Sequence, residues 1–302
     1  LLVCFGGILA GYDTGVIGSA LLSLKTQFYL ADFFQGIFAS CIIPGIMTGV
    51  MIASIASDRY RHRSVIFIAA LIYITGVIIT ILSLSVALLF FGRIFTGVAI
   101  GIILVITPLY LAEISAPTLR GRFIATFQLA ITLGIFLGYL SSYCFAHWGS
   151  WRWMFLGGMP WAIFLLLATF YLPETVAHTK NNRLDFSWKK MLCREYFRPF
   201  TIGLGLAILQ QVTGINAIFY FAPQILLSVY HQPATSAIYS SMIIAAGNFL
   251  FTIMALFILD SIGRRPVLMI SLIFQSISLV LLALSSIGFL PSYPFLFVCY
   301  LL

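Results

Sequence analysis

Two ionisable side chains lie inside apolar stretches of this sequence. Asp13 belongs to the segment Gly11-Tyr-Asp-Thr-Gly15, well inside the uncharged run 1–22, and Arg93 interrupts the apolar stretch 87–112. A charged carboxylate in an apolar interior costs several kcal/mol unless it is paired or protonated. Both residues lie about two helical turns from the same end of their helices. We therefore expect Arg93 to be the partner of Asp13.

A buried acid of this kind permits two interpretations. If Asp13 alternates between its arginine partner and a proton, protonation weakens the pair and changes which conformation of the protein is favoured. Such a pair would couple proton movement to a conformational change. If Asp13 never takes up a proton, the pair is a permanent structural ion pair. The residues alone leave both interpretations open.

Uncharged polar side chains form a second candidate set. The segment Gln210-Gln-Val-Thr-Gly-Ile-Asn216 is followed by Tyr220 in otherwise apolar sequence, and isolated amides occur at Gln128 and Asn248. Gly214 would permit local unwinding of a helix. Amides donate and accept hydrogen bonds without carrying charge, so they suit a sugar or polyol better than an amino acid or a phosphate. The alternative is that these amides join neighbouring helices.

The composition places these residues in a membrane. The 302 residues are 62% hydrophobic and 8% charged, with a mean hydropathy of +1.10, whereas a soluble domain has about 25% charged residues. A soluble enzyme and a nucleic-acid-binding protein are therefore excluded, and the net charge of +8 reflects basic residues in the links between apolar runs. The histidines and cysteines show no catalytic or ligand spacing, so we expect no catalytic set, no metal site and no cofactor.

The apolar runs predict how often the chain crosses the bilayer. A spanning helix needs about 20 apolar residues. We expect an all-α polytopic membrane protein with nine spanning helices and the start of a tenth after Pro294, clipped at both ends. The nine runs are 1–22, 36–57, 65–84, 87–112, 123–145, 153–172, 200–230, 238–259 and 267–288.

The basic residues predict the orientation of these helices. Of the 16 basic residues, all but Lys25, Arg93 and Arg152 fall on the side that carries the N-terminus. Cytoplasmic loops are the ones enriched in Lys and Arg. We therefore expect a multi-pass protein of the cell membrane, plasma or inner, with a cytoplasmic N-terminus.

One long polar link divides the chain into two parts. The segment 173–199 separates six predicted helices from at least three others. A similar charged element follows the second helix of each part, Asp58-Arg-Tyr-Arg-His-Arg63 and Asp260-Ser-Ile-Gly-Arg-Arg265. The repeat predicts two related halves: an N-terminal bundle at 1–175, a cytoplasmic linker at 176–198 and a partial C-terminal bundle at 199–302. The alternative is that short charged loops recur by chance.

Several motifs resemble those of the sugar porters of the major facilitator superfamily. The resemblance runs the whole chain and is carried by residues in the family's order and spacing. For the fourth and fifth helices these are Gly92-Arg93, Gly97, Gly101, Pro108-Leu-Tyr110-Leu-Ala-Glu113, Pro117, Arg120-Gly121-Arg122 and Gln128. For the seventh and eighth helices they are Gln210-Gln211, Gly214-Ile-Asn216, Tyr220, Asn248 and Asp260-x-x-Gly263-Arg264-Arg265.

The resemblance implies a major facilitator fold of two six-helix bundles, the C-terminal one truncated here, that works by alternating access. It implies contacts to a monosaccharide, a pentose such as xylose or a hexose such as glucose, from Gln128, Gln210, Gln211, Asn216, Tyr220 and Asn248. It also implies a cytoplasmic gating network that joins the halves when the carrier is open outward. The network residues are Asp58, Arg63, Glu113, Arg120, Asp260, Arg264 and Arg265.

Asp13 matches a position that is an acid in the proton-coupled members of the family and resembles that of bacterial xylose and hexose symporters. The resemblance therefore favours proton symport, with Asp13 and Arg93 as the coupling pair. A passive sugar facilitator, a non-transporting sugar sensor and a degenerate fragment are the alternatives. The expected partners are a monosaccharide, a proton and the lipid bilayer, with no nucleic acid, and we expect a monomer.

Overall fold

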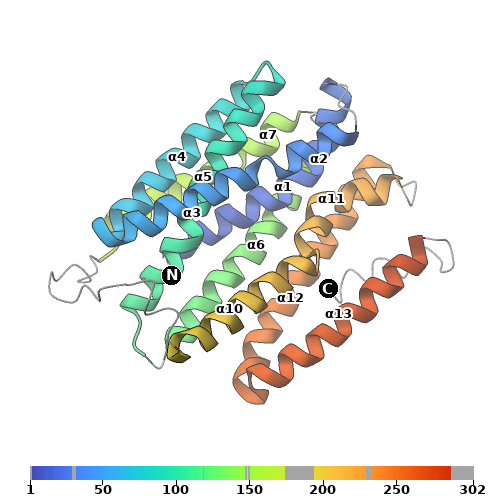
Figure 1. Ribbon diagram of the computed structural model, residues 1–302. Coiled ribbons are helices and arrows are strands. Elements are labelled where there is room, and N and C mark those ends of the chain that lie inside the picture. The colour runs from blue at the N-terminus through green and yellow to red at the C-terminus, as the bar shows by residue number, and fades with distance from the viewer. Residues whose placement is uncertain are drawn as a thin grey trace.

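The computed structural model describes residues 2–28, 32–117, 119–146, 148, 150–173, 194–228 and 233–286, and the regular structure in these ranges is entirely helical (Figure 1). After a short 3-10 turn at Leu2–Cys4, the first six spans are built from eight α-helices. These are α1 (Phe5–Phe28), α2 (Asp32–Ser40), α3 (Ile42–Arg59), α4 (His62–Leu82), α5 (Val86–Ile114), α6 (Arg120–Ala146), α7 (Trp151–Leu156) and α8 (Met159–Tyr171).

The remaining helices are α10 (Arg194–Val212), α11 (Ile215–Ser228), α12 (Ala234–Ile262) and α13 (Arg264–Ser286). Eight segments are long and apolar enough to cross a membrane, and the apolar part of α13, Arg265–Leu281, is shorter. Each of the nine predicted runs therefore contains a helix, and the all-α polytopic fold class is confirmed. The predicted start of a tenth helix lies outside the described residues, as does most of the predicted linker 176–198. The last residues of that linker, 194–198, belong to α10, so this helix begins earlier than the apolar run predicts.

Three spans consist of two helices each. Cys41 separates α2 from α3, Gly157 and Gly158 separate α7 from α8, and Thr213 with Gly214 separates α10 from α11. Gly214 has a φ of 75°, a conformation that side chains with a Cβ rarely adopt. The predicted local unwinding at Gly214 is therefore present.

Small residues fix two close helix contacts. Gly11 and Gly15 of α1 pack against α6 around Gly134 and Gly138, and a Cβ on Gly11 would overlap the carbonyl oxygen of Ile131. In the same way the pair Gly45 and Gly49 of α3 packs against the pair Gly97 and Gly101 of α5. Glycines spaced in this way let helix backbones approach closely in a membrane. These contacts align α1 with α6, and α5 with α3, and so set the positions of Asp13 and Arg93.

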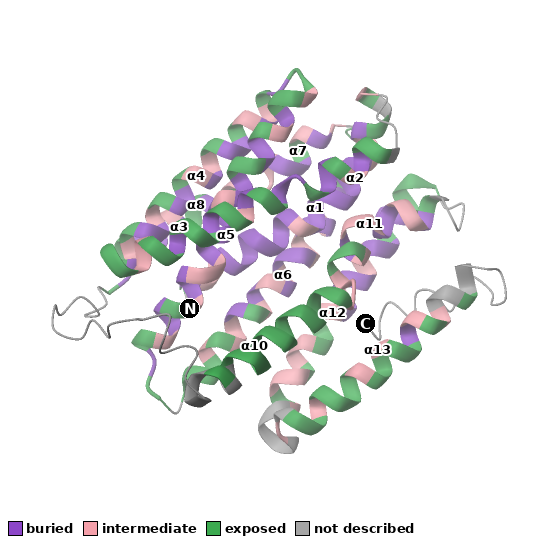
Figure 2. Cartoon of the chain, viewed as in Figure 1, coloured by how far each residue is buried: buried purple, intermediate pink, exposed green. Residues whose placement is uncertain are grey.

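Burial differs sharply along the chain (Figure 2). Of the most apolar window of the first span, 78% is buried inside the protein, whereas the window in the span Phe200–Leu227 is 6% buried. Large apolar side chains are exposed on the outer helices, for example Phe164, Ile208 and Phe274. Surfaces of this kind are normal against lipid, where apolar side chains need no cover from water.

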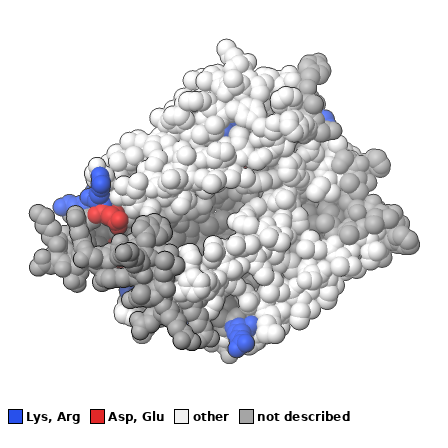
Figure 3. Space-filling model, viewed as in Figure 1, with Lys and Arg blue, Asp and Glu red and all other residues white. Residues whose placement is uncertain are grey.

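The helices form a first group, α1–α8, and a second group, α10–α13 (Figure 1), with a recess between them in the view of Figure 3. The groups meet where α11 packs against α1 and α12 packs against α6. The Tyr139 hydroxyl donates a hydrogen bond to the carbonyl of Phe219, and the Gln224 amide donates one to the side chain of Gln35. These bonds lie toward the end of α1 that is opposite to the chain's N-terminus. The division at 175 and 199 remains a prediction.

Candidate functional site

The carboxylate of Asp13 and the guanidinium of Arg93 form a bidentate ion pair between α1 and α5. The Nη1–Oδ1 and Nη2–Oδ2 distances are 2.5 and 2.8 Å. The two residues are 3% and 1% exposed, respectively. Two parallel charge-assisted hydrogen bonds are the strongest arrangement available to these groups. The partner expected from the sequence is therefore in contact with Asp13, at the depth that the two apolar runs predict.

Two aromatic residues that the sequence analysis did not select surround the pair. The Arg93 Cζ atom lies 5.2 Å from the centroid of the Phe155 ring. The Tyr12 hydroxyl lies 2.7 Å from Ser141 Oγ and donates a 2.7 Å hydrogen bond to the carbonyl of Met154. The helix break at Gly157 and Gly158 leaves room for tyrosines, since a Cβ at Gly157 would overlap the Tyr12 hydroxyl and one at Gly158 would crowd the Tyr73 hydroxyl. Within the described ranges, no three His, Cys, Asp or Glu side chains are grouped as metal ligands.

The six predicted sugar contacts lie on four helices that border the recess. Gln128 is on α6, Gln210 and Gln211 are on α10, Asn216 and Tyr220 are on α11, and Asn248 is on α12. The four residues Gln128, Gln210, Gln211 and Asn216 are exposed, and Tyr220 and Asn248 are half-buried.

Two contacts connect members of this amide set. Across the helix break at Gly214, Asn216 Nδ2 donates a 3.2 Å hydrogen bond to Gln211 Oε1. Tyr220 packs against the buried cluster that contains Tyr12 and Val16 of α1, so α11 contacts the helix that carries Asp13. The Oδ1 atom of Asn248 is buried and has no hydrogen-bond partner among the described residues.

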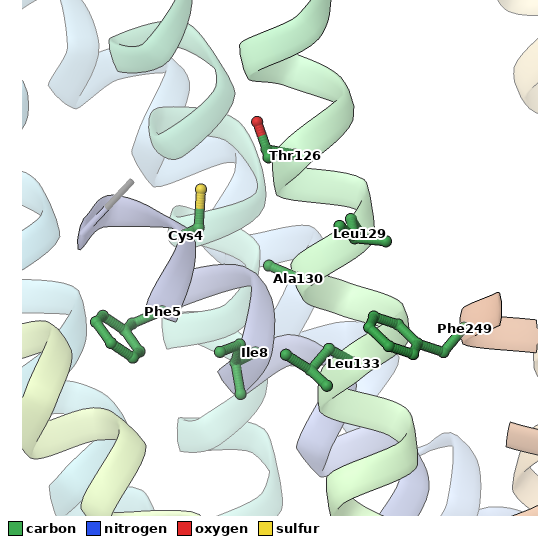
Figure 4. A pocket seen from close by; sticks show the side chains of 8 residues that line it. All are labelled: Cys4, Phe5, Ile8, Thr126, Leu129, Ala130, Leu133 and Phe249. Carbon is green, nitrogen blue, oxygen red and sulfur yellow. The ribbon is translucent and has the colours of Figure 1, made fainter. Parts of the chain in front are cut away.

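A separate apolar cavity of about 230 Å³ lies between α1, α6 and α12 (Figure 4). Its lining includes Phe5, Leu129 and Phe249 but neither Gln128 nor Asn248, although these two amides are sequence neighbours of lining residues. The cavity offers few polar partners. It is therefore not a site for a sugar, which needs many hydrogen bonds.

The predicted gating residues lie mainly at the end of the first group that carries the N-terminus. Asp58, Glu113 and Arg120 are exposed and Arg63 is half-buried. Arg265 is exposed on α13, whereas the side chains of Asp260 and Arg264 lie outside the described part of the structure.

One close contact at this end involves a residue that the sequence analysis did not use. His62, the first residue of α4, is 2% exposed, and its Nδ1 lies 3.0 Å from Oε2 of Glu113. Arg63 instead donates a long hydrogen bond of 3.5 Å to the carbonyl of Leu172. The sequence signal for His62 was its position in the charged element Asp58–Arg63, but a histidine beside a loop carries little information by itself.

Arg152, one of three basic residues on the side predicted to be less basic, has a structural role. Its Nε and Nη2 atoms donate 3.0 Å hydrogen bonds to the carbonyls of Ile81 and Ser83 at the end of α4. Its Cζ lies 4.6 Å from the centroid of the Trp151 ring. A cation at the C-terminal end of a helix is favoured by the helix dipole and by the unpaired carbonyls.

Comparison with known proteins identifies the family to which this helical membrane protein belongs. The sequence profile described as "Sugar (and other) transporter" matches residues 1–183 and 177–293. The chain belongs to this family, the sugar porters of the major facilitator superfamily, and it is a transporter of the multi-pass membrane type rather than an enzyme.

Individual relatives of the chain are also named as transporters of sugars. The chain is 30% identical to the D-xylose transporter of Levilactobacillus brevis over 92% of its own length and 68% of that protein. It is 28% identical to the galactose-proton symporter of Escherichia coli over 88% of its own length and 65% of that protein. Among solved structures, the partially occluded inward open conformation of the xylose transporter XylE from E. coli matches with a TM-score of 0.80 and 23% identity. The match covers all of this chain and 82% of that one.

Proposed function

We propose that this chain carries a monosaccharide, a pentose or a hexose, across the cell membrane together with a proton. The observation that carries the proposal is the buried Asp13–Arg93 ion pair, which lies on α1, the helix against which Tyr220 of α11 packs. Through the packing of α1 against α11, the protonation state of Asp13 can influence a helix that bears residues of the proposed sugar site. Relatives named as a D-xylose transporter and a galactose-proton symporter support both the cargo and the coupling ion.

The proposed sugar site is the amide set Gln128, Gln210, Gln211, Asn216, Tyr220 and Asn248. Amide oxygens and nitrogens on both sides of the recess would exchange hydrogen bonds with the sugar hydroxyls. The side chains of Gln210 and Gln211 are exposed, like all residues of α10 from 200 to 212. At Gln210 binding would therefore replace water, whereas at Gln211 it would compete with the hydrogen bond from Asn216.

The proposed orientation places the N-terminus in the cytoplasm, in accord with the distribution of Lys and Arg. The contacts of Tyr139 with Phe219 and of Gln35 with Gln224 then close the outer end of the pathway. In this conformation, with Asp13 bound to Arg93, the acid is ionised. This corresponds to a carrier that is open to the cytoplasm after the release of sugar and proton.

The proposed cycle follows from the cost of burying charge. After the carrier turns outward, Asp13 accepts a proton from outside and its attraction to Arg93 weakens. The change in the pair favours the movement that closes the outer end over the bound sugar. Asp58, Arg63, Glu113, Arg120, Asp260, Arg264 and Arg265 would hold the cytoplasmic ends together in the outward-open state. Exposed ion pairs are individually weak, so such a network can open and close repeatedly.

The test uses the protein in proteoliposomes, with uptake of labelled xylose, glucose and galactose measured with and without an inward proton gradient. We expect the gradient to drive accumulation of at least one of these sugars. Asp13→Asn should abolish accumulation but retain exchange of labelled for unlabelled sugar, because it removes the titrating group and keeps the side-chain shape. Asp13→Glu is the matched control, since it keeps an ionisable carboxyl. Equal loss of accumulation and exchange in Asp13→Asn would contradict the coupling role.

A passive sugar facilitator is the second candidate. It is favoured by the geometry of the pair itself, because two hydrogen bonds in a nearly dry site also describe a permanent structural ion pair. A facilitator would equilibrate the sugar without accumulating it, and the proton gradient would not change the final level in the wild type.

A further inference from the structure

The ring of Phe155 faces the guanidinium of Arg93. The Cζ atom of Arg93 lies 5.2 Å from the ring centroid. The negative face of an aromatic ring attracts a cation within about 6 Å of its centroid. Phe155 is 4% exposed, so water hardly screens this attraction. Asp13 binds Nη1 and Nη2 of the same guanidinium, while Nε has no hydrogen-bond partner in the described part of the chain. The Arg93 guanidinium therefore contacts both a carboxylate and the face of an aromatic ring.

Contacts of Tyr12 and Trp151 position the helices that carry Asp13 and Phe155. Tyr12 precedes Asp13 on α1, and its hydroxyl donates a 2.7 Å hydrogen bond to the carbonyl of Met154, the residue before Phe155 on α7. The rings of Trp151 and Phe155 pack edge to face, with centroids 6.1 Å apart and planes at 77°. The backbone of α7 beside Phe155 is therefore held against α1, and the Phe155 ring cannot turn away from Arg93 without losing its contact with Trp151.

We propose that Phe155 is a positioning residue for proton coupling, whose ring holds the Arg93 guanidinium when Asp13 takes up a proton. This inference rests on the proposed function. While Asp13 is ionised, the carboxylate balances most of the arginine charge. Once Asp13 is protonated, the buried cation keeps the face of the ring, beside the neutral side chains of Cys41 and Tyr73. The ring therefore stabilises the protonated state more than the paired state.

The other titratable groups beside the pair do not change charge in the same pH range. Those that interact electrostatically with Asp13 and Arg93 are Tyr12 of α1, Cys41 between α2 and α3, Tyr73 of α4 and Tyr220 of α11. Phenols and thiols are neutral near pH 7. Asp13 is therefore the group whose proton alters the charge of this site.

Removal of the ring should shift the pH dependence of uptake in a predictable direction. In Phe155→Leu the protonated state loses its stabilising partner, so a higher proton concentration is needed to protonate Asp13. We expect the pH of half-maximal uptake to fall by about one unit, a tenfold change in the proton concentration required. Sugar exchange at acid pH on both sides, where Asp13 is protonated in both proteins, should change much less. Phe155→Tyr and Phe155→Trp keep an aromatic face and should restore the pH profile.

The experiment measures sugar uptake against external pH for the wild type, Phe155→Leu, Phe155→Tyr and a matched control, Phe38→Leu. Phe38 is a fully buried phenyl group of the same hydrophobic cluster, so its substitution removes a similar volume without touching Arg93. A variant with 3,4,5-trifluorophenylalanine at 155 keeps the ring shape but weakens its negative face. This variant provides the readout if Phe155→Leu fails to reach the membrane.

The outcomes separate this inference from the function on which it rests. An acid shift in Phe155→Leu or the fluorinated variant, with a normal profile in Phe155→Tyr and Phe38→Leu, supports it. A proton-driven wild type whose pH midpoint is unchanged in these variants overturns the role of Phe155 and leaves symport intact. A lower maximal rate with an unchanged midpoint also overturns it, because that is the effect of a purely structural residue. A wild type without proton-driven uptake refutes the proposed coupling and this inference together.

Discussion

The ion pair between α1 and α5 differs from the amides of α10 and α11 in how much of its hydrogen bonding the protein itself supplies. Asp13 and Arg93 share two hydrogen bonds in a site that is almost completely buried. Gln210 and Gln211 are exposed, and only one hydrogen bond between two side chains, from Asn216 to Gln211, connects members of their segment.

Physical chemistry accounts for this difference. An uncompensated charge inside a membrane protein is costly, so a buried acid must have a partner or a proton at every stage of its work. A neutral amide can face water at little cost, and it remains available for a ligand. The buried pair therefore suits a change of conformation, and the exposed amides suit ligand binding. Substitutions in the pair should affect stability, whereas substitutions in the amides should affect binding.

The largest effect should follow from leaving one charge of the pair alone. Arg93→Ala leaves a buried carboxylate without its partner and should lower the free energy of unfolding by about 3–5 kcal/mol. The double variant Asp13→Asn/Arg93→Leu contains no buried charge and should recover most of that loss. Thermal unfolding in detergent, followed by tryptophan fluorescence, measures both. If the double variant is as unstable as Arg93→Ala, the cost does not arise from the unpaired carboxylate.

A smaller loss should follow from separating the helices that carry the pair. Gly134→Leu places a side chain where α6 touches the backbone of Ile8 on α1. Overpacking of this kind costs about 1–3 kcal/mol, and we expect the transport rate to fall as well because Asp13 moves relative to Arg93. Gly36→Leu is the control, since a Cβ at Gly36 meets no atom within 4 Å. Equal destabilisation by both variants would show that the close contact of α1 and α6 is not the cause.

The sequence predicts the spans and the ion pair better than it predicts the details around them. Hydropathy locates the helices because a span must be apolar throughout, and it identifies Asp13 because a charge there violates that rule. It does not predict the start of α10, since Arg194 and Arg198 end the apolar run without ending the helix.

The aromatic contacts around the pair were not predictable for a related reason. Phe155 and Tyr12 lie in apolar runs where aromatic residues are common, so neither stands out from its neighbours. Their roles depend on a third helix, α7, whose position relative to Arg93 is a property of the packing. His62 was missed in the same way, because its burial against Glu113 is decided by how α4 and α5 meet.

The exposed amides should affect binding without affecting stability. Gln211→Ala removes hydrogen bonds that we assign to the sugar, and a neutral hydrogen bond contributes about 0.5–1.5 kcal/mol. The KM for the transported sugar should therefore rise about threefold to tenfold, while the unfolding temperature stays unchanged. Gln275→Ala on α13 removes an amide that we do not assign to the site, and its KM should remain that of the wild type. An unchanged KM in Gln211→Ala, or a large fall in its stability, would assign Gln211 to packing between helices.

The smallest expected effect concerns the helix break that presents these amides. Gly214 has a φ of 75°, so Gly214→Ala forces a side chain into the left-handed region and should lower the free energy of unfolding by about 1 kcal/mol. Gly203→Ala, inside α10 with no atom near the added Cβ, should instead raise it by about 0.4–1 kcal/mol, because alanine restricts the unfolded chain. The two substitutions are chemically identical and differ only in backbone conformation. If Gly214→Ala is also stabilising, α10 and α11 form a continuous helix in the membrane, and the amides of Gln211 and Asn216 are not held across a break.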